Sequence, residues 1–176
     1  MATIDQLDVE ILARLTENAR IGIAELAAEL GVSRTTVNLR LKRLEDDGVL
    51  LGFRPVIDLA QIGAGVRASL SIEIDQRRMA HIVHELSRLP EVLEVSIRAG
   101  REDVLAHVAI GSLEELQVLT TAIVEIDGVR RTTSTFTVST PVPHRILPLL
   151  GKVVAGRGWG RSTPSPREMP ASHGAL

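Results

Sequence analysis

Residues 33–43 carry side chains that can bind the base edges and phosphates of nucleic acid. Projected at about 100° per residue of helix, Thr35, Asn38 and Lys42 fall on one side of this segment. Hydroxyl, amide and guanidinium groups can form hydrogen bonds with base edges, and lysine and arginine can neutralise phosphates. The candidate DNA-binding residues are Ser33, Arg34, Thr35, Thr36, Asn38, Arg40, Lys42 and Arg43.

The expected roles of these residues differ along the helix. Base contacts are expected in its first turns, from Arg34, Thr35, Thr36 and Asn38. Lys42 and Arg43 are expected to contact phosphates. Arg40 projects toward the edge of the buried side, so a contact within the domain or with a phosphate is as well supported as a base contact. The acidic run 45–47 repels phosphate, which leaves the first two turns to bind.

Two predicted helices and a turn position these side chains. Apolar residues recur at helical spacing, at Ile23, Leu26, Ala27 and Leu30 and then at Val37, Leu41 and Leu44. Gly31 lies where a left-handed helix end is favourable, and Ser33 lies at the N-cap of the second helix. A preceding helix begins after Asp5, and residues 49–57 are strand-like, typical of a wing. The order predicts a helix-turn-helix whose second helix enters the DNA major groove.

The alternative interpretation is an ordinary three-helix domain with a solvated, charged face. Residues 1–58 hold 10 acidic and 7 basic side chains, a net charge of −3, although four of the bases lie in one helix. The local field matters more than this sum, so we expect modest and strongly salt-dependent affinity for DNA. The turn, the cap, the apolar stripe and the polar face agree in position, which favours DNA binding.

Composition excludes several other classes of protein. The chain has 176 residues, 44% of them hydrophobic, and a net charge of −2, as expected of a globular protein with one large or two small domains. It has no cysteine, so disulfides and thiolate chemistry are excluded. Neither a signal peptide nor a membrane span is expected, and a cytoplasmic location is compatible. No catalytic motif, metal-ligand cluster or cofactor site is evident.

Beyond residue 64 the apolar period changes from helical to two, which predicts a second domain. Expected strands cover residues 66–75, 92–99, 103–110 and 129–138, and expected helices cover residues 79–89 and 112–126. This β-α-β-β-α-β order predicts a ferredoxin-like sandwich, and the chain is therefore α+β in class. The sheet face without helices would carry Leu105, His107 and Ala109, which is apolar enough to meet another subunit.

The pattern divides the chain into four parts. These are a winged helix-turn-helix domain at 1–50, a strand linker at 51–64, a ferredoxin-like sensing and oligomerisation domain at 65–140, and a Pro/Gly-rich basic tail at 141–176. Residues 146–154 could form a short apolar patch against the domain. From about residue 155 the tail is expected to be disordered, with attraction to phosphate as its possible function.

The chain resembles the Lrp/AsnC (feast/famine) family of transcriptional regulators over residues 4–140. The resemblance rests on Ile4-Asp5, Asp8, Ile11-Leu12, Asn18-Ala19-Arg20, Glu25-Leu26-Ala27, Gly31-Val32-Ser33, Arg40, Arg43-Leu44-Glu45, Gly48-Val49, Gly52-Phe53, Gly63, Gly100-Arg101-Glu102-Asp103, Gly128-Val129 and Thr132. It implies a regulator of transcription with two partners, double-stranded DNA and a small effector, an amino acid in many members. It also implies homodimers that assemble further, as far as octamers. The effector positions that it implies are Arg98, Gly100, Asp103, Thr132 and Ser134.

Two alternative functions stay open at this point. Some relatives with this two-domain layout are sirohaem decarboxylases, which would need basic and histidine side chains around a tetrapyrrole. His81 and His84 are three residues apart on one predicted helix, a spacing that is more typical of a solvated face. The second alternative is an architectural protein that wraps DNA with little sequence preference.

Overall fold

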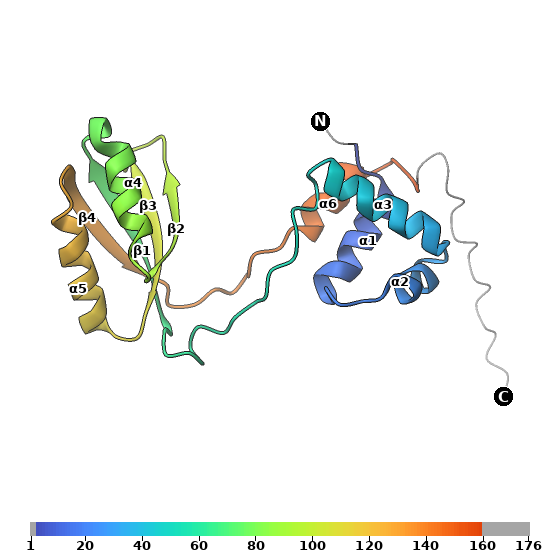
Figure 1. Cartoon of the computed structure of the whole chain (residues 1–176), viewed down its shortest axis with the longest axis horizontal. Helices are drawn as coiled ribbons and strands as arrows, with labels where there is room; N and C mark the ends of the chain where they lie inside the picture. The colour runs from blue at the N-terminus through green and yellow to red at the C-terminus, as the bar shows by residue number, and fades with distance from the viewer. Residues whose placement is uncertain (1–2, 160–176) are drawn as a thin grey trace. The chain divides into compact units, whose positions relative to one another are not determined.

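Three helices build the N-terminal unit: α1 (Gln6–Glu17), α2 (Ile23–Leu30) and α3 (Arg34–Asp46) (Figure 1). The computed structural model describes residues 3–159. The apolar sides of the three helices meet in one core that includes Leu7, Ile11, Leu26, Leu30 and Val37. These are residues that recur at helical spacing, so the predicted helix-turn-helix is confirmed.

Local side chains and backbone conformation set the ends of these helices. Asp5 and Asp8 form a reciprocal capping box at the start of α1, in which each carboxylate accepts the other residue's backbone N–H. Gly31 ends α2 with a φ of +65°, in the left-handed region that glycine adopts without strain. The Ser33 hydroxyl then accepts the Thr36 N–H at 3.0 Å and begins α3.

The second unit is a four-stranded antiparallel sheet with two helices on one face. Its strands are β1 (Val66–Ile74), β2 (Val92–Ile97), β3 (Val104–Ile110) and β4 (Val129–Phe136), in the spatial order β2-β3-β1-β4. Helix α4 (Met79–Ser87) follows β1 after a short 3-10 turn, η1 (Gln76–Arg78), and α5 (Leu113–Val124) precedes β4. The predicted ferredoxin-like order and the α+β class are therefore confirmed.

The core of the sheet unit lies between the helices and one face of the strands. It includes Leu70 and Ile72 of β1, Ile82 of α4 and Ile123 of α5, all of them fully buried. The opposite face is less apolar than expected. Leu105 and Ala109 are nearly covered there, among the hydroxyls of Ser69, Ser71, Thr133 and Thr135, and the His107 ring lies 3.1 Å from Ser69 Oγ.

The wing and linker predicted as a strand at residues 49–57 form no strand, and this expectation was wrong. Residues 51–58 are exposed and extended, with Leu51 at 91% and Val56 at 101% exposure. A strand requires a neighbouring strand to satisfy its N–H and C=O groups, and residues 51–58 pair with no strand among the described residues. The apolar, β-branched composition of this segment was therefore not sufficient to form a strand.

The predicted apolar patch at 146–154 is a helix, α6 (Leu147–Val154), and it packs on α1 (Figure 1). The chain therefore passes between the two units twice. Residues up to Pro55 and from Val142 onward form one unit, and Val56–Pro141 form the other. Residues 155–159, expected in the tail, continue along the N-terminal unit, and the rest of the predicted disordered tail, residues 160–176, lies outside the described residues. Within residues 3–159, no helix has the length and apolar character needed to cross a membrane.

Candidate functional site

Most of the predicted base-contacting side chains lie on the open surface of α3. Arg34, Thr35 and Asn38 are exposed, as is Lys42, which lies about one turn beyond Asn38. Ser33 and Thr36 lie close to one another at the N-terminus of α3, with their hydroxyl oxygens 2.8 Å apart. Because the Ser33 oxygen also caps the helix, its first task is to fix where α3 begins. The exposed set leaves hydroxyl, amide and guanidinium groups open to a ligand.

The inner side of α3 is held by a buried ion-pair network with α1. Asp8 is fully buried, and its two carboxylate oxygens lie 3.1 Å from Arg40 Nη1 and 2.5 Å from Arg43 Nη2. Asp5 lies 2.5 Å from the same Arg40 nitrogen. The side chain of Arg40 is 10% exposed and that of Arg43 is 41% exposed. The network therefore attaches the middle of α3 to the first turn of α1.

Opposing electrostatic effects act on this network. Burial raises the pKa of the Asp8 carboxyl, because the charged form loses its hydration, and the nearby Asp5 carboxylate raises it further. The hydrogen bond from the Asp5 N–H and the positive charges of Arg40 and Arg43 lower the pKa of Asp8 and so act against this rise. Burial also tends to lower the pKa of Arg40, but the two aspartates more than offset it and the net shift is upward. A charge this deeply buried persists only with such partners.

This geometry separates the predicted DNA-binding residues into two groups. Arg40 points into the domain, which favours the intradomain role over base contact, and Arg43 divides its donors between Asp8 and solvent. The sequence predicts Asp5 as the residue before the first helix, and it predicts no ion pair between Asp5 or Asp8 and the second helix of the motif. One signal could have identified their second role, because Asp8 lies at helical spacing from the apolar Ile11 and Leu15 and so had to be buried.

Asp103, a predicted effector residue, stabilises the turn between β2 and β3. Its carboxylate accepts the Ile74 N–H at 2.9 Å and the Gln76 side-chain amide at 3.2 Å. These hydrogen bonds, with a smaller contribution from Arg130, hold the pKa of Asp103 below its ordinary value. Arg98 and Gly100 lie exposed in the same turn. Within one chain, Asp103 therefore holds the β2–β3 turn against the end of β1.

Thr132 and Ser134 lie on β4, facing the helices. Thr132 pairs with Ile72 and Ser134 with Leu70 across the β1–β4 ladder, so both share the face that covers the core. The Thr132 hydroxyl is buried and has no hydrogen-bond partner among the described residues. Leaving a buried hydroxyl unpaired costs about 1–3 kcal/mol. The Thr132 hydroxyl is therefore an unsatisfied polar group inside the sheet unit.

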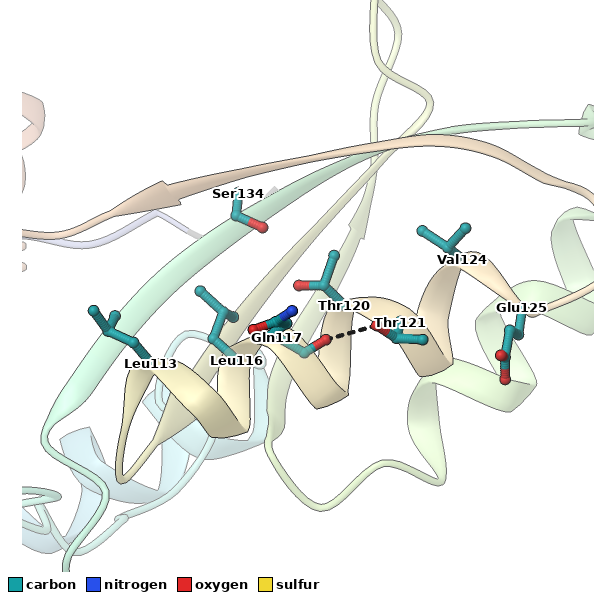
Figure 2. Close-up of a pocket in the computed structure, with 8 residues that line it drawn as sticks. All are labelled: Leu113, Leu116, Gln117, Thr120, Thr121, Val124, Glu125 and Ser134. Carbon is teal, nitrogen blue, oxygen red and sulfur yellow. Dashed lines mark hydrogen bonds between the residues drawn. The ribbon is translucent and has the colours of Figure 1, made fainter.

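Ser134 also lines an open groove of about 520 Å³ between β4 and α5 (Figure 2). Its other lining residues come from α5 and its C-cap residue and are Leu113, Leu116, Gln117, Thr120, Thr121, Val124 and Glu125. Glu125 could pair with an ammonium group, but the lining contains no lysine, arginine or histidine for a carboxylate. By itself the groove is an incomplete site for an amino acid.

The predicted effector residues do not meet in one pocket of a single chain. Arg98 follows β2, whereas Thr132 and Ser134 lie on β4, and these two strands are the opposite edges of the sheet. β3 and β1 lie between them. A ligand that touches both groups would need a site built from more than one copy of the chain.

The histidines expected in a tetrapyrrole enzyme do not converge either. His81 and His84 are exposed on α4. His107 lies on the sheet face opposite to the helices, beside Ser69. Among the described residues, no group of three or more His, Asp or Glu side chains could hold a metal ion. The candidate site with the most consistent geometry is therefore the exposed side of α3.

Known families and proteins share this pattern. Residues 4–50 match the winged helix-turn-helix DNA-binding family, and residues 67–147 match the Lrp/AsnC ligand binding domain. An uncharacterised HTH-type transcriptional regulator of Pyrococcus abyssi is 31% identical over 130 residues, which are 73% of this chain and 82% of that protein. The HTH-type transcriptional regulator AldR of Mycolicibacterium smegmatis is 32% identical over 117 residues, 65% of this chain and 68% of AldR.

Solved structures agree with the sequence relatives. The structure of E. coli AsnC superposes with a TM-score of 0.76 at 30% identity and covers 84% of this chain and 100% of its own. The B. subtilis LrpC structure has a TM-score of 0.74 at 18% identity, covering 81% of this chain and 100% of its own, and it shows the shared fold alone.

Replacing Asp8 with alanine should destabilise the N-terminal unit strongly. The change leaves Arg40 buried with fewer acceptors, and removing one partner of a buried ion pair costs about 3–5 kcal/mol. The free energy of unfolding from urea titrations followed by circular dichroism measures this. Glu10→Ala is the control, because Glu10 pairs with Arg14 in a partly exposed bond on the same helix, where the expected loss is below about 1 kcal/mol. Equal losses for both variants would contradict a structural role for the network.

Asp103 should stabilise the sheet unit at neutral pH and lose this effect in acid. A carboxyl whose pKa is lowered by folding stabilises above its unfolded pKa of about 3.9, and this stabilisation disappears as the pH falls through the lower folded value. Asp103→Asn should therefore unfold at a lower temperature than wild type at pH 7, and the difference should shrink and close as the pH falls below the unfolded pKa and through the lower folded one. Melting temperatures across pH, with Glu102→Gln as control from the same turn, check this. A constant difference at every pH would refute it.

Proposed function

The chain belongs to the Lrp/AsnC family of transcriptional regulators, and from this premise we propose that it binds selected DNA sequences and that a small effector, an amino acid, modulates its binding or assembly. The single observation that carries the DNA-binding part is the division of α3 into two sides. On the inner side, Arg40 and Arg43 are held by Asp5 and Asp8. The outer side leaves Arg34, Thr35 and Asn38 exposed. A rigidly held helix with such donors can read base edges in the major groove.

Each exposed residue has a proposed role. Arg34, Thr35, Thr36 and Asn38 contact base edges, while Lys42 and the exposed part of Arg43 contact phosphates. Lys42 lies 3.5 Å from Asp46, but this pair is solvent-exposed and of little strength, so a phosphate can replace it. Arg40 and Ser33 act indirectly, by holding and starting the helix. The cell compartment that this function requires is the cytoplasm.

Asn38→Ala and Lys42→Ala should affect DNA binding in different ways. Loss of the amide at Asn38 should cost about 1–3 kcal/mol on a preferred duplex and much less on random DNA. Loss of Lys42 should weaken all duplexes alike and reduce the salt slope by about one. Fluorescence anisotropy on a duplex selected by the wild-type protein from a random pool measures both. Arg88→Ala, which removes an exposed charge from the other unit, should change neither.

An architectural, sequence-tolerant protein is the second candidate, and the same measurement decides between them. Wild-type protein that binds random and selected duplexes equally would favour wrapping without sequence preference. In that case Asn38→Ala would reduce affinity for every duplex equally or not at all.

The proposed effector site is shared between copies of the chain. Arg98 and Gly100 follow the edge strand β2, whereas Thr132 and Ser134 lie on the opposite edge strand β4, and Asp103 lies between them, bonded to the end of β1. One chain alone therefore does not enclose a small ligand with all five residues. The free face of the sheet, with its flat row of hydroxyls, is the surface on which a homodimer forms, and further assembly toward octamers brings the edges together. The unpartnered Thr132 hydroxyl is the strongest single indication of an external hydrogen-bond partner.

Thr132→Val tests this site without disturbing the fold. The change keeps the shape and removes a buried hydroxyl that has no partner, so stability without ligand should be unchanged or slightly higher. The response of oligomer size or DNA affinity to an added amino acid should be lost. Analytical ultracentrifugation with each of the twenty amino acids provides the measurement. Thr16→Val, at a hydroxyl that bonds within α1, should respond as wild type does. If wild type responds to none of the twenty, the amino-acid proposal fails.

A further inference from the structure

The C-terminal segment 147–159 completes the core of the N-terminal unit. Val154, the last residue of α6, is 1% exposed and packs in one cluster with Ile4, Val9 and Leu44. These partners come from the start of the chain, from α1 and from the end of α3. Leu150, one turn earlier in α6, adds to the same cluster. The matched family domains end at residue 147, so these contacts are made by chain beyond them.

The turn after α6 bonds to the backbone at the beginning of α1. Gly156 and Gly158 have φ values of +80° and +62°, a left-handed conformation that favours glycine. The Gln6 N–H donates to the Gly158 carbonyl at 2.9 Å, and Arg157 Nη1 donates to the Ile4 carbonyl at 3.2 Å. The N–H groups of a first helical turn have no partner within the helix, so this bond satisfies one of them.

These two hydrogen bonds lie on either side of Asp5. Residues 4 and 6 are bonded to the C-terminal segment, and the carboxylate of Asp5 binds Arg40 of α3. The backbone that carries this carboxylate is therefore held from both sides. If this backbone moved, the Asp5 carboxylate would move with it. Arg40, which holds α3 in its orientation, would then lose an acceptor in its present position.

Residues 142–159, which include this segment, also reverse the net charge of the DNA-binding unit. Residues 3–55 hold nine acidic and seven basic side chains, a net charge of −2. Residues 142–159 add Arg145, Lys152 and Arg157 and no acid, which brings the described unit to +1. A unit that binds a polyanion gains from this added positive charge.

We propose that residues 147–159 are a C-terminal clasp, a positioning element that holds the first turn of α1 and, through Asp5 and Asp8, the orientation of α3 for DNA binding. This inference rests on the DNA-binding function proposed above. The clasp itself contacts no base, and Val154 and Arg157 are positioning residues. The sheet unit is thereby an insertion within the DNA-binding unit, linked to it at both of its ends.

Two adjacent valines of α6 provide a matched test in the full-length chain. Val154→Asp places a charge in the cluster, whereas Val153→Asp places the same charge on a side chain that is 45% exposed. Trp159 is the only tryptophan, the chain has no tyrosine, and the indole packs against the core of the N-terminal unit. Its fluorescence therefore reports whether the clasp is bound, independently of DNA, and hydrogen exchange at the Gln6 amide is a second, independent report.

Val154→Asp should shift the Trp159 emission to longer wavelength and remove the protection of the Gln6 amide. It should also weaken binding to the selected duplex about tenfold, the scale of an indirect positioning contact, while circular dichroism shows that α1–α3 are still folded. Val153→Asp should leave emission and amide protection unchanged and affinity within about twofold. If Val154→Asp unfolds the unit, Val154→Ala replaces it, with Val153→Ala as control.

Each other outcome overturns the proposal. Unchanged emission and Gln6 exchange in Val154→Asp would show that the clasp is not bound in solution. Release of the clasp without loss of affinity for the selected duplex would show that the clasp has no positioning role. Equal losses of affinity in Val154→Asp and Val153→Asp would show the same. Wild-type protein that selects no duplex would refute the proposed function instead, and the fluorescence and exchange results would still report on the clasp.

Discussion

The charge of Asp8 is the constraint around which the DNA-binding unit is arranged. A carboxylate removed from water must recover its lost hydration from hydrogen bonds and opposite charges. Here it does so from the Asp5 N–H and from Arg40 and Arg43. The two arginines lie about one helical turn apart on α3. Satisfying the charge of Asp8 therefore fixes both the rotation of α3 about its axis and its distance from α1. A purely apolar contact between the helices would fix neither so tightly.

The same constraint limits the electrostatics available to DNA. Of the four bases in α3, Arg40 is used within the domain and Arg43 is shared with Asp8. The end of α3 carries three acids in succession. Under the proposed function, attraction to the phosphates depends on few side chains, and sequence discrimination would come from short groups such as Asn38. This balance is suited to a protein that binds several adjacent sites as an oligomer, because individually weak contacts then add up.

Local physics explains what the sequence could predict. Caps at Asp5 and Ser33 and the left-handed Gly31 depend only on neighbouring residues, and the alternation in residues 66–75 identifies a strand covered on one face. The strand predicted at 49–57 failed because pairing requires a partner that no local pattern supplies. The place where α6 binds was not predictable either, because an apolar stripe shows that a helix packs but not against which surface. Burial of Asp8 could have been predicted from its helical spacing, whereas its pairing with residues 32 and 35 positions away could not.

The hydrogen bond between Ile4 and Arg157 joins residues 153 positions apart. During synthesis the three N-terminal helices leave the ribosome first, yet their core lacks Val154 and their first turn lacks its carbonyl partner until the whole sheet unit has emerged. The DNA-binding unit is thus completed only after the sheet unit has been synthesised. A nascent chain that has not yet reached residue 154 would lack these contacts of the first helical turn.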